Sequence, residues 1–419
     1  MTARLHCAQN PLWIRSLALL RVTPSLLNSF SACTITGFEY FKLSYCATPI
    51  LRYTSLSMGR YRRFRDTDWS LLIVSLLICA LGVLQIYSAT RDTRFHDAWW
   101  KQLVWISIAL ALMWVVTSID YHTLLGQIPL LYVTSVTALV GVLAVGRLVY
   151  GSRRWIRILG INFQISEFVK LVIILVVARY VSELRSNEIK PRDLLKLGGL
   201  VGIPALLVMY QPDLGTGLTY LPILAAGVLV AGVRWQYLAI IGLVGALALP
   251  AGWYVLKDYQ RARLVTFLDP SGDPRGAGYQ VIQSKIAVGD GGVWGRGVTR
   301  GTQAQLRFLP VPHTDFIFSA FAEEHGFVGV LVVLGLYFLL LMQIVQNAQM
   351  APDRAGMYVC MGVAALLLFH VLVNVGMVVG RMPVTGIPLP LMSSGGSNTF
   401  SVFMMLGLVN SVRLRRFVS

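Results

Sequence analysis

Residues 257–315 read KDYQRARLVTFLDPSGDPRGAGYQVIQSKIAVGDGGVWGRGVTRGTQAQLRFLPVPHTD and form the only long segment after Trp69 that is too polar to lie in a bilayer. Runs long enough to cross hydrocarbon flank it on both sides, so it is predicted to be a loop on one membrane face. It carries eight Lys or Arg, many glycines, and Asp269, Asp273, Asp290 and Asp315. Loops longer than about 15 residues are usually functional or disordered, and aromatic residues such as Trp294 argue against disorder. The sequence therefore predicts an ordered loop that carries chemistry.

The composition places this loop in a membrane protein. The chain has 419 residues, of which 56% are hydrophobic and 13% charged, and its mean hydropathy is +0.65. A soluble domain of this length could not bury so much apolar surface. The net charge of +17 does not indicate a nucleic-acid binder, because the basic residues fall between apolar runs. Membrane orientation and an anionic substrate explain it better. The five cysteines show no metal-ligand spacing, so neither a disulfide nor a zinc site is predicted.

The apolar runs predict the fold. A window of about 19 residues finds about ten spans. They lie near residues 69–89, 99–118, 123–145, 166–184, 195–211, 214–233, 236–256, 316–345, 356–379 and 397–412. We predict an all-α integral membrane protein with about ten transmembrane helices and a large ordered extracytoplasmic loop between helices 7 and 8. Lys and Arg are richer in the short segments on the side of the termini, which places both termini in the cytoplasm and the long loop outside.

Residues 1–57 differ in character from the rest of the chain. They mix polar, aromatic and Cys residues without a long apolar run or a signal-peptide layout. Met58 precedes a basic stretch and the first strong span, as at the start of many membrane proteins. We predict that 1–57 is an extension, either disordered or upstream of the true start, and that 58–419 is the membrane domain. Expression from Met58 is expected to support full function.

At three places in the sequence, ionisable residues have either a functional or a purely structural explanation. Asp273 lies among Pro and Gly residues that predict a turn. It could be a catalytic carboxylate, or it could be an Asx-turn residue with a purely structural role. Glu167 and Lys170 are three residues apart at the start of the fourth span, so they share a helix face. They could form a functional pair or a structural ion pair. Asp213 precedes the sixth span, where it is a functional carboxylate or simply the cap of that helix.

Two further segments suit an anionic ligand. A cluster of basic residues lies on the outer side, before the fourth span, and indicates an anionic partner there. Before the last span, prolines, serines and a glycine pair interrupt the apolar pattern, and irregular backbone at membrane depth is tolerated where it lines a cavity. Glycine backbone and serine hydroxyls suit phosphate oxygens, and a plain re-entrant loop is the alternative. The residues concerned are Arg153, Arg154 and Arg157 in the first segment, and Ser393, Ser394, Gly395 and Gly396 in the second.

Taken together, these segments resemble one known family. The matching stretches are QISEFVK (164–170), QPDLGTG (211–217), FLDPSGDPRGAGYQVIQSKIAVGDGG (267–292), HTDFIFSAFAEEHG (313–326) and PVTGIPLPLMSSGGS (383–397). They are similar to the signatures of the SEDS family (shape, elongation, division and sporulation), which are membrane peptidoglycan polymerases. The resemblance covers Arg60 to Arg416, and GTQAQLRFLP (301–310) looks more like the elongation-type than the division-type members. Two positions depart from the family pattern: Ile165 stands where Pro is usual, and Val311 where Glu is usual.

The resemblance implies an inverting glycosyltransferase of the bacterial inner membrane that polymerises lipid II, a disaccharide-pentapeptide on undecaprenyl diphosphate, during cell elongation. It implies that Asp273 is the general base for the acceptor hydroxyl. Departure of the diphosphate needs positive charge or a divalent cation such as Mg or Mn, although no ligand set is defined in the sequence. The candidate substrate-binding residues are Arg153, Arg154, Arg157, Glu167, Lys170, Asp213, Arg275, Ser393, Ser394, Gly395 and Gly396.

The implied partners are lipid II, a class B penicillin-binding protein and other membrane proteins of the elongation complex, and no nucleic acid. Two rival functions share part of this pattern. A lipid II flippase would bind the same diphosphate, but it needs alternating access and no base on a fixed loop. A scaffold for a transpeptidase would tolerate the loss of all these ionisable groups.

Overall fold

The structure is a computed structural model that describes residues 67–91, 93–149, 152–158, 161–184, 189–240, 242–243, 247, 254, 258–272 and 276–416. The extension predicted for residues 1–57 and most of the seventh predicted span, 236–256, lie outside these residues. Within them, long helices form at the predicted apolar spans. They are α2 (Trp69–Thr90), α3 (Ala98–Ser118), α6 (Ile165–Ser182), α7 (Pro191–Tyr210), α14 (Ile317–Gln349), α15 (Arg354–Val378) and α16 (Gly396–Leu414).

Five of the described helices are long and apolar enough to cross a membrane by length and composition, namely α2, α3, α7, α14 and α15. Two predicted spans are each divided into a short and a longer helix. The third consists of α4 (Tyr121–Gly126) and α5 (Ile128–Val145), which meet at Gln127. Pro129 explains this break, because it lies in the first turn of α5 and has no amide hydrogen to donate to Leu125 of α4. The sixth consists of α8 (Leu214–Leu218) and α9 (Tyr220–Val230), which meet at Thr219.

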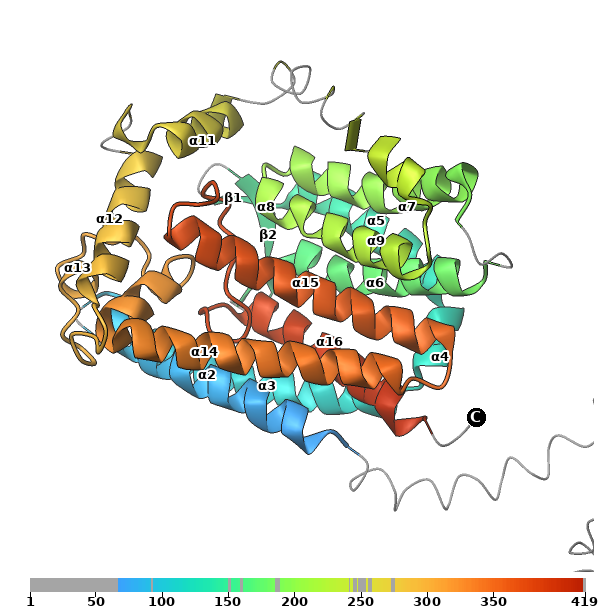
Figure 1. The fold of residues 1–419 in the computed structure, drawn as a ribbon, viewed down its shortest axis with the longest axis horizontal. Coiled ribbons are helices and arrows are strands. Elements are labelled where there is room, and N and C mark those ends of the chain that lie inside the picture. The colour runs from blue at the N-terminus through green and yellow to red at the C-terminus, as the bar shows by residue number, and fades with distance from the viewer. Residues whose placement is uncertain are drawn as a thin grey trace, which may run out of the picture. The chain divides into compact units, whose positions relative to one another are not determined.

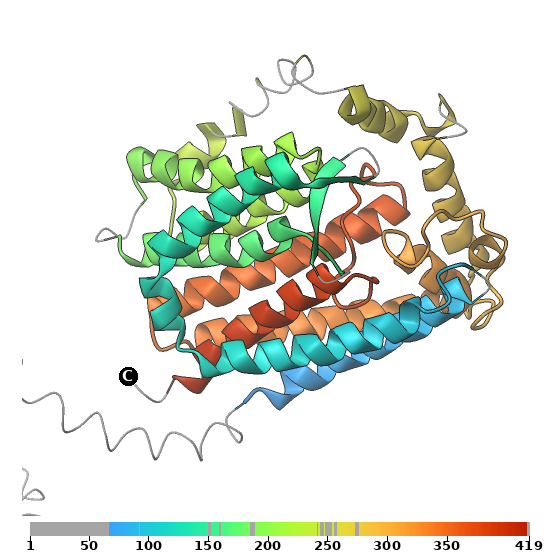
Figure 2. The same ribbon diagram turned by 180° about the vertical axis from the view of Figure 1, so that it is seen from behind.

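Helices α15 and α16 run through the middle of the bundle, with α2, α3 and α14 on one side and α6 and α9 on the other (Figures 1 and 2). Their buried side chains, such as Leu366 and Phe403, belong to one continuous apolar core. Helix α16 approaches α3 closely, because a Cβ at Gly407 would lie 2.6 Å from the carbonyl oxygen of Met113. Small residues permit this close backbone contact between membrane helices.

A small antiparallel sheet departs from the all-helical prediction. It joins α5 to α6 and consists of β1 (Arg147–Val149), β2 (Ser152–Ile158) and β3 (Ile161–Phe163) in the order β1-β2-β3. Leu148 is paired with Arg153, and Arg157 with Asn162. Strands this short leave no mark in a window long enough to detect a transmembrane helix. The predicted basic cluster therefore lies on a strand.

The described part of the long polar segment is mainly helical. It contains α11 (Asp258–Leu268), the 3-10 turn η2 (Pro270–Gly272), α12 (Ala277–Asp290) and α13 (Thr302–Gln305). Between α12 and α13, the glycine-rich turn 291–297 is hydrogen bonded to the start of α14. The amide of Arg296 donates to the carbonyl of Glu323 at 3.0 Å, and the amide of Gly297 to that of Glu324 at 2.9 Å. Gly295 has φ +81°, and a Cβ there would lie 2.2 Å from the carbonyl oxygen of Glu324, so this contact requires glycine.

Candidate active site

The sequence motifs converge where α6 and α8 begin, beside residues 313–316 and the irregular loop 383–395 that leads into α16. At the start of α6, Lys170 Nζ lies 2.7 Å from Glu167 Oε1. The exposed fraction is 1% for Lys170 and 4% for Glu167. The predicted pair therefore forms, but it is buried, and neither charge can touch a substrate in this structure. Breaking a buried pair by removing one partner leaves an uncompensated charge, which is strongly destabilising.

Asp213 is both a helix cap and part of a charged cluster. Its Oδ1 accepts a hydrogen bond from the amide of Thr216 at 3.2 Å, which caps α8. The same oxygen lies 3.3 Å from Arg154 Nη1 of β2, and Oδ2 accepts from Gln164 Nε2 at 2.7 Å. The two alternatives left open by the sequence are therefore compatible. The Arg154 side chain is 31% exposed, so it can contact a ligand while it holds Asp213.

Several polar groups of loop 383–395 are already hydrogen bonded within the protein. Ser393 Oγ donates to the carbonyl of Thr314 at 2.7 Å and accepts from the amide of Leu389 at 2.9 Å. The amide of Gly395 donates to Gln102 Oε1 at 3.2 Å. Ser393 is buried, whereas Ser394, Gly395 and Gly396 are partly exposed. Of this predicted group, the hydroxyl of Ser393 is therefore engaged in holding the loop against residues 313–316.

Asp315, a residue to which the sequence analysis assigned no role, lies against the same loop. Its carboxylate Oδ2 would be 3.5 Å from a Cβ at Gly386. Burial raises the pKa of the Asp315 carboxyl above its usual range, although the positive charges of Arg154 and Arg263 act to lower it. Arg263 of α11 also donates to the carbonyl of Thr385 at 3.4 Å. Helix α11, which leads into η2, is thus connected to the loop beside Asp315.

Helix α15 contributes two more polar residues that sequence analysis missed. His370 Nε2 lies 3.3 Å from Lys170 Nζ, and Asn374 Nδ2 donates to the carbonyl of Asp315 at 2.9 Å. Both are buried in an otherwise apolar helix. An ionisable residue within a membrane span is a functional candidate by default, and that signal was present in the sequence.

Four predicted site residues lie partly or wholly outside the described part of the chain. Asp273 and Arg275 lie outside the described residues, between Gly272 at the end of η2 and Gly276 before α12. Arg153 and Arg157 belong to β2, but their side chains are not described. Among the described residues, no group of three or more His, Cys, Asp or Glu side chains could hold a metal ion. The described side chains therefore do not make up a site for the divalent cation that the resemblance allows.

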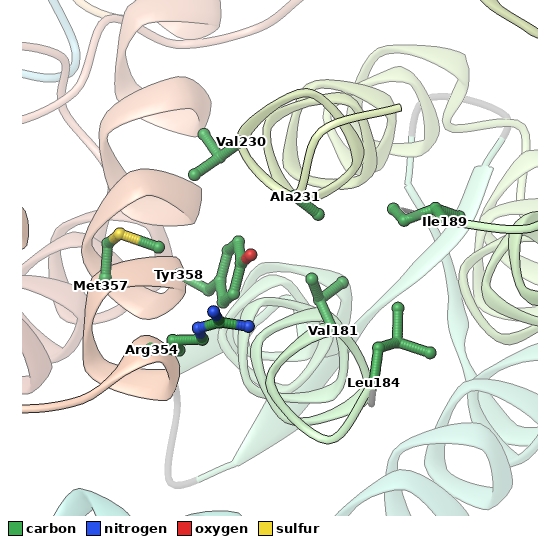
Figure 3. Close-up of a pocket in the computed structure, with 8 residues that line it drawn as sticks. All are labelled: Val181, Leu184, Ile189, Val230, Ala231, Arg354, Met357 and Tyr358. Carbon is green, nitrogen blue, oxygen red and sulfur yellow. The ribbon is translucent and has the colours of Figure 1, made fainter. Parts of the chain in front are cut away.

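A separate cavity lies at the other end of α6 (Figure 3). Its volume is about 210 Å³, and it is lined by Val181, Leu184, Ile189, Val230, Ala231, Arg354, Met357 and Tyr358. The helix rises about 1.5 Å per residue, so the 14 positions from Glu167 to Val181 correspond to roughly 20 Å. None of the described residues that line this cavity is a predicted site residue, so it is distinct from the site where α6 and α8 begin.

Comparison with known proteins gives the family. A family model for the cell cycle proteins FtsW, RodA and SpoVE matches residues 68–416. The chain belongs to this family. Peptidoglycan glycosyltransferase MrdB of Escherichia coli K12 is 38% identical over 357 residues, which cover 83% of this chain and 94% of that protein.

Solved structures of the family share the fold. The rod shape determining protein RodA of Thermus thermophilus has 31% identity and a TM-score of 0.64, over 84% of this chain and 98% of that one. A chain of a peptidoglycan synthase complex that coordinates polymerization and crosslinking has 35% identity and a TM-score of 0.73, over 84% of this chain and 99% of that one. The predicted helical membrane fold is confirmed, and the chain is a multi-pass membrane protein. The count of ten spans stays a prediction.

Proposed function

We propose that this protein is a peptidoglycan glycosyltransferase of the elongation type, which polymerises lipid II into glycan strands and releases undecaprenyl diphosphate. The observation that carries the proposal is the convergence of four family segments at one end of the bundle, within a match that spans residues 68–416. A relative named MrdB is 38% identical to this chain, against 35% for a relative named FtsW, which favours the elongation type over the division type.

In the proposed reaction, the acceptor hydroxyl attacks the anomeric carbon of the donor while the bond to the lipid diphosphate breaks. The hydroxyl must lose its proton as the new bond forms, and a positioned carboxylate suits that task. We assign this role to Asp273, which follows η2. Asp269 closes the turn at η2, because its carbonyl accepts a hydrogen bond from the amide of Gly272 at 3.3 Å.

Negative charge accumulates on the departing diphosphate, and fixed positive groups stabilise it. Arg154 is the best placed of the described residues, because its guanidinium is partly exposed and is held by Asp213. Arg153 and Arg157 on the same strand are further candidates, and Arg275 is a candidate from the sequence alone. A divalent cation, if bound, would supply the same charge stabilisation. Lys170 is buried, so we assign it an indirect role.

We also propose an orientation in the membrane and a partner protein. The excess of Lys and Arg on the side of the termini supports cytoplasmic termini and a site on the outer face of the inner membrane. The likeness to a chain of a peptidoglycan synthase complex supports a complex with a class B penicillin-binding protein, which would cross-link the strands made here.

Polymerisation of lipid II by the purified full-length protein tests the proposal, with its transpeptidase partner added if the protein alone is inactive. Asp273→Asn is nearly isosteric and removes only the proton acceptor, so the rate should fall by about 10²–10⁴-fold. Asp269→Asn is the matched control in the same turn and should retain most of the rate. Near-normal polymerisation by Asp273→Asn would refute the assignment. Transport of lipid II across vesicles that survives in Asp273→Asn would support the flippase alternative.

A further inference from the structure

Lys170 has a second partner besides Glu167. Its Nζ lies 2.7 Å from Glu167 Oε1 and 3.3 Å from His370 Nε2. The exposed fraction of all three residues is small, at 1% for Lys170, 4% for Glu167 and 2% for His370. Lys170 and His370 are 200 positions apart in the sequence. The buried charge of α6 is therefore connected directly to α15.

The other ring nitrogen of His370 fixes the direction of these hydrogen bonds. Nδ1 lies 3.2 Å from the carbonyl oxygen of Pro388. A carbonyl oxygen only accepts, so Nδ1 carries the hydrogen and Nε2 presents its lone pair to the Lys170 ammonium. A doubly protonated ring would offer no acceptor to Lys170. The neutral ring is the form that satisfies both neighbours, and it joins Lys170 to Pro388 in one directed chain.

Asn374 holds the same loop one turn further along α15. Its Nδ2 donates to the carbonyl of Ile387 at 2.9 Å and to that of Asp315 at 2.9 Å. Residues four apart share a helix face, so α15 presents His370 and Asn374 to the consecutive carbonyls of Ile387 and Pro388. His370 differs from Asn374 because it also reaches α6.

The position of the loop is passed on to the candidate site. Leu389 and Ser393 are joined by two hydrogen bonds, from the amide of Leu389 to Ser393 Oγ at 2.9 Å and from the amide of Ser393 to the carbonyl of Leu389 at 3.0 Å. Ser393 Oγ in turn donates to the carbonyl of Thr314, next to Asp315. A shift of Pro388 would therefore move the backbone that carries Asp315.

We propose that His370 is a positioning residue that connects the buried Glu167–Lys170 pair to loop 383–395 and so sets the geometry of the active site. The proposal rests on the proposed glycosyltransferase function. It gives the buried pair a role in the reaction without contact with lipid II. A misplacement of about 1 Å at a reacting group can cost on the order of 10²-fold in rate, so a connection of this kind has a measurable effect.

Two substitutions separate positioning from packing. His370→Gln keeps one acceptor and one donor, as the neutral imidazole has, whereas His370→Leu keeps apolar volume and offers neither. Val363→Ala is the control, because Val363 is fully buried on α15 about two turns before His370. The purified full-length variants are compared in lipid II polymerisation and in hydrogen exchange of peptides covering residues 383–395.

We expect His370→Gln to retain kcat within about threefold, and His370→Leu to lower kcat by about 10–100-fold with KM changed by less than about threefold. Exchange in loop 383–395 should become faster in His370→Leu alone. Val363→Ala should lower the melting temperature without either change. Unchanged loop exchange in His370→Leu, or faster exchange with unchanged kcat, would overturn the proposal. If Asp273→Asn were fully active, the proposed site would fail, and the exchange comparison would still decide whether His370 holds the loop.

Discussion

Arg154 Nη1 lies 3.3 Å from Asp213 Oδ1, so strand β2 is connected to the residue that caps the start of α8. The Asp213 side chain is 4% exposed and that of Arg154 is 31% exposed. One member of the pair is therefore anchored and the other remains accessible. This arrangement presents a guanidinium at a fixed place, as binding of a diphosphate requires.

The pair leads to a stability prediction for Asp213. Asp213→Ala removes the α8 cap and the partner of Arg154, and should lower the free energy of unfolding by about 1–3 kcal/mol. Asp213→Asn can still accept from the amide of Thr216, so its loss should be smaller. Thermal unfolding of the purified proteins measures both. Equal destabilisation by the two substitutions would show that the cap contributes little.

The buried ion pair at the start of α6 should respond in a non-additive way. Lys170→Met leaves the Glu167 carboxylate buried without its partner, which should cost about 3–5 kcal/mol. The double variant Glu167→Gln, Lys170→Met removes both charges and should recover most of that stability. We expect polymerisation to stay low in the double variant, because the connection to His370 is still missing. A stable double variant with the wild-type rate would leave the pair with a structural role only.

The burial of Asp315 predicts that the difference in stability between the wild-type protein and Asp315→Asn depends on pH. Burial raises the pKa of its carboxyl above the usual 3.8, so the folded protein binds this proton more tightly than the unfolded chain does. The stabilising contribution is fully present below the unfolded pKa and is lost as pH rises through the folded pKa. Asp315→Asn should therefore be more stable than wild type at pH 7, and the difference should shrink as pH falls toward 4. Melting temperatures across this range test the sign, and a gap that widened on acidification would contradict it.

The glycine-rich turn gives a matched pair of substitutions. Gly295 has φ +81° and a Cβ there would lie 2.2 Å from the carbonyl oxygen of Glu324. Gly297 has φ +94°, and among the described residues the nearest atom to a Cβ there is Arg300 Cδ at 3.6 Å. Alanine at either position costs about 1–3 kcal/mol for the left-handed backbone. Gly295→Ala also forces the turn away from α14, so it should lower the melting temperature more than Gly297→Ala. Similar melting temperatures for the two variants would argue against the close contact.

Topology is tested independently of catalysis. If the Lys and Arg distribution sets the orientation, a tag placed after Ser419 is cytoplasmic. A cysteine introduced at Ser271 should then react with an impermeant reagent applied to intact cells. Labelling of the C-terminal tag from outside would reverse the proposed orientation and move the long loop to the cytoplasm.

The positions of the spans could be predicted from sequence because each span must be apolar by itself. Burying polar groups in hydrocarbon costs free energy whatever the rest of the chain does. The breaks at Gln127 and Thr219 were missed, since hydropathy averages over a window longer than a single helical turn. The strands between α5 and α6 were missed for the same reason. Local patterns also found Glu167 with Lys170, because residues three apart share a helix face.

Contacts between distant segments could not be predicted in this way. Lys170 and His370 are 200 positions apart, and Ser393 and Thr314 are 79 apart. No propensity or spacing rule joins such residues, and only the packing of α6, α15 and the loop brings them together. The family resemblance indicated which segments matter, but not that Ser393 would be engaged by the backbone at Thr314.

The placement of Arg154 on a strand has a consequence for how the segment between α5 and α6 can change. Side chains alternate between the two faces of a strand, so the removal of one residue turns every following side chain over. Loss of Ser152, the one residue of β2 that precedes its arginines, would direct the Arg154 guanidinium away from Asp213, even though the number of arginines stayed the same. This short ribbon should therefore tolerate changes of residue type more readily than a one-residue change in length.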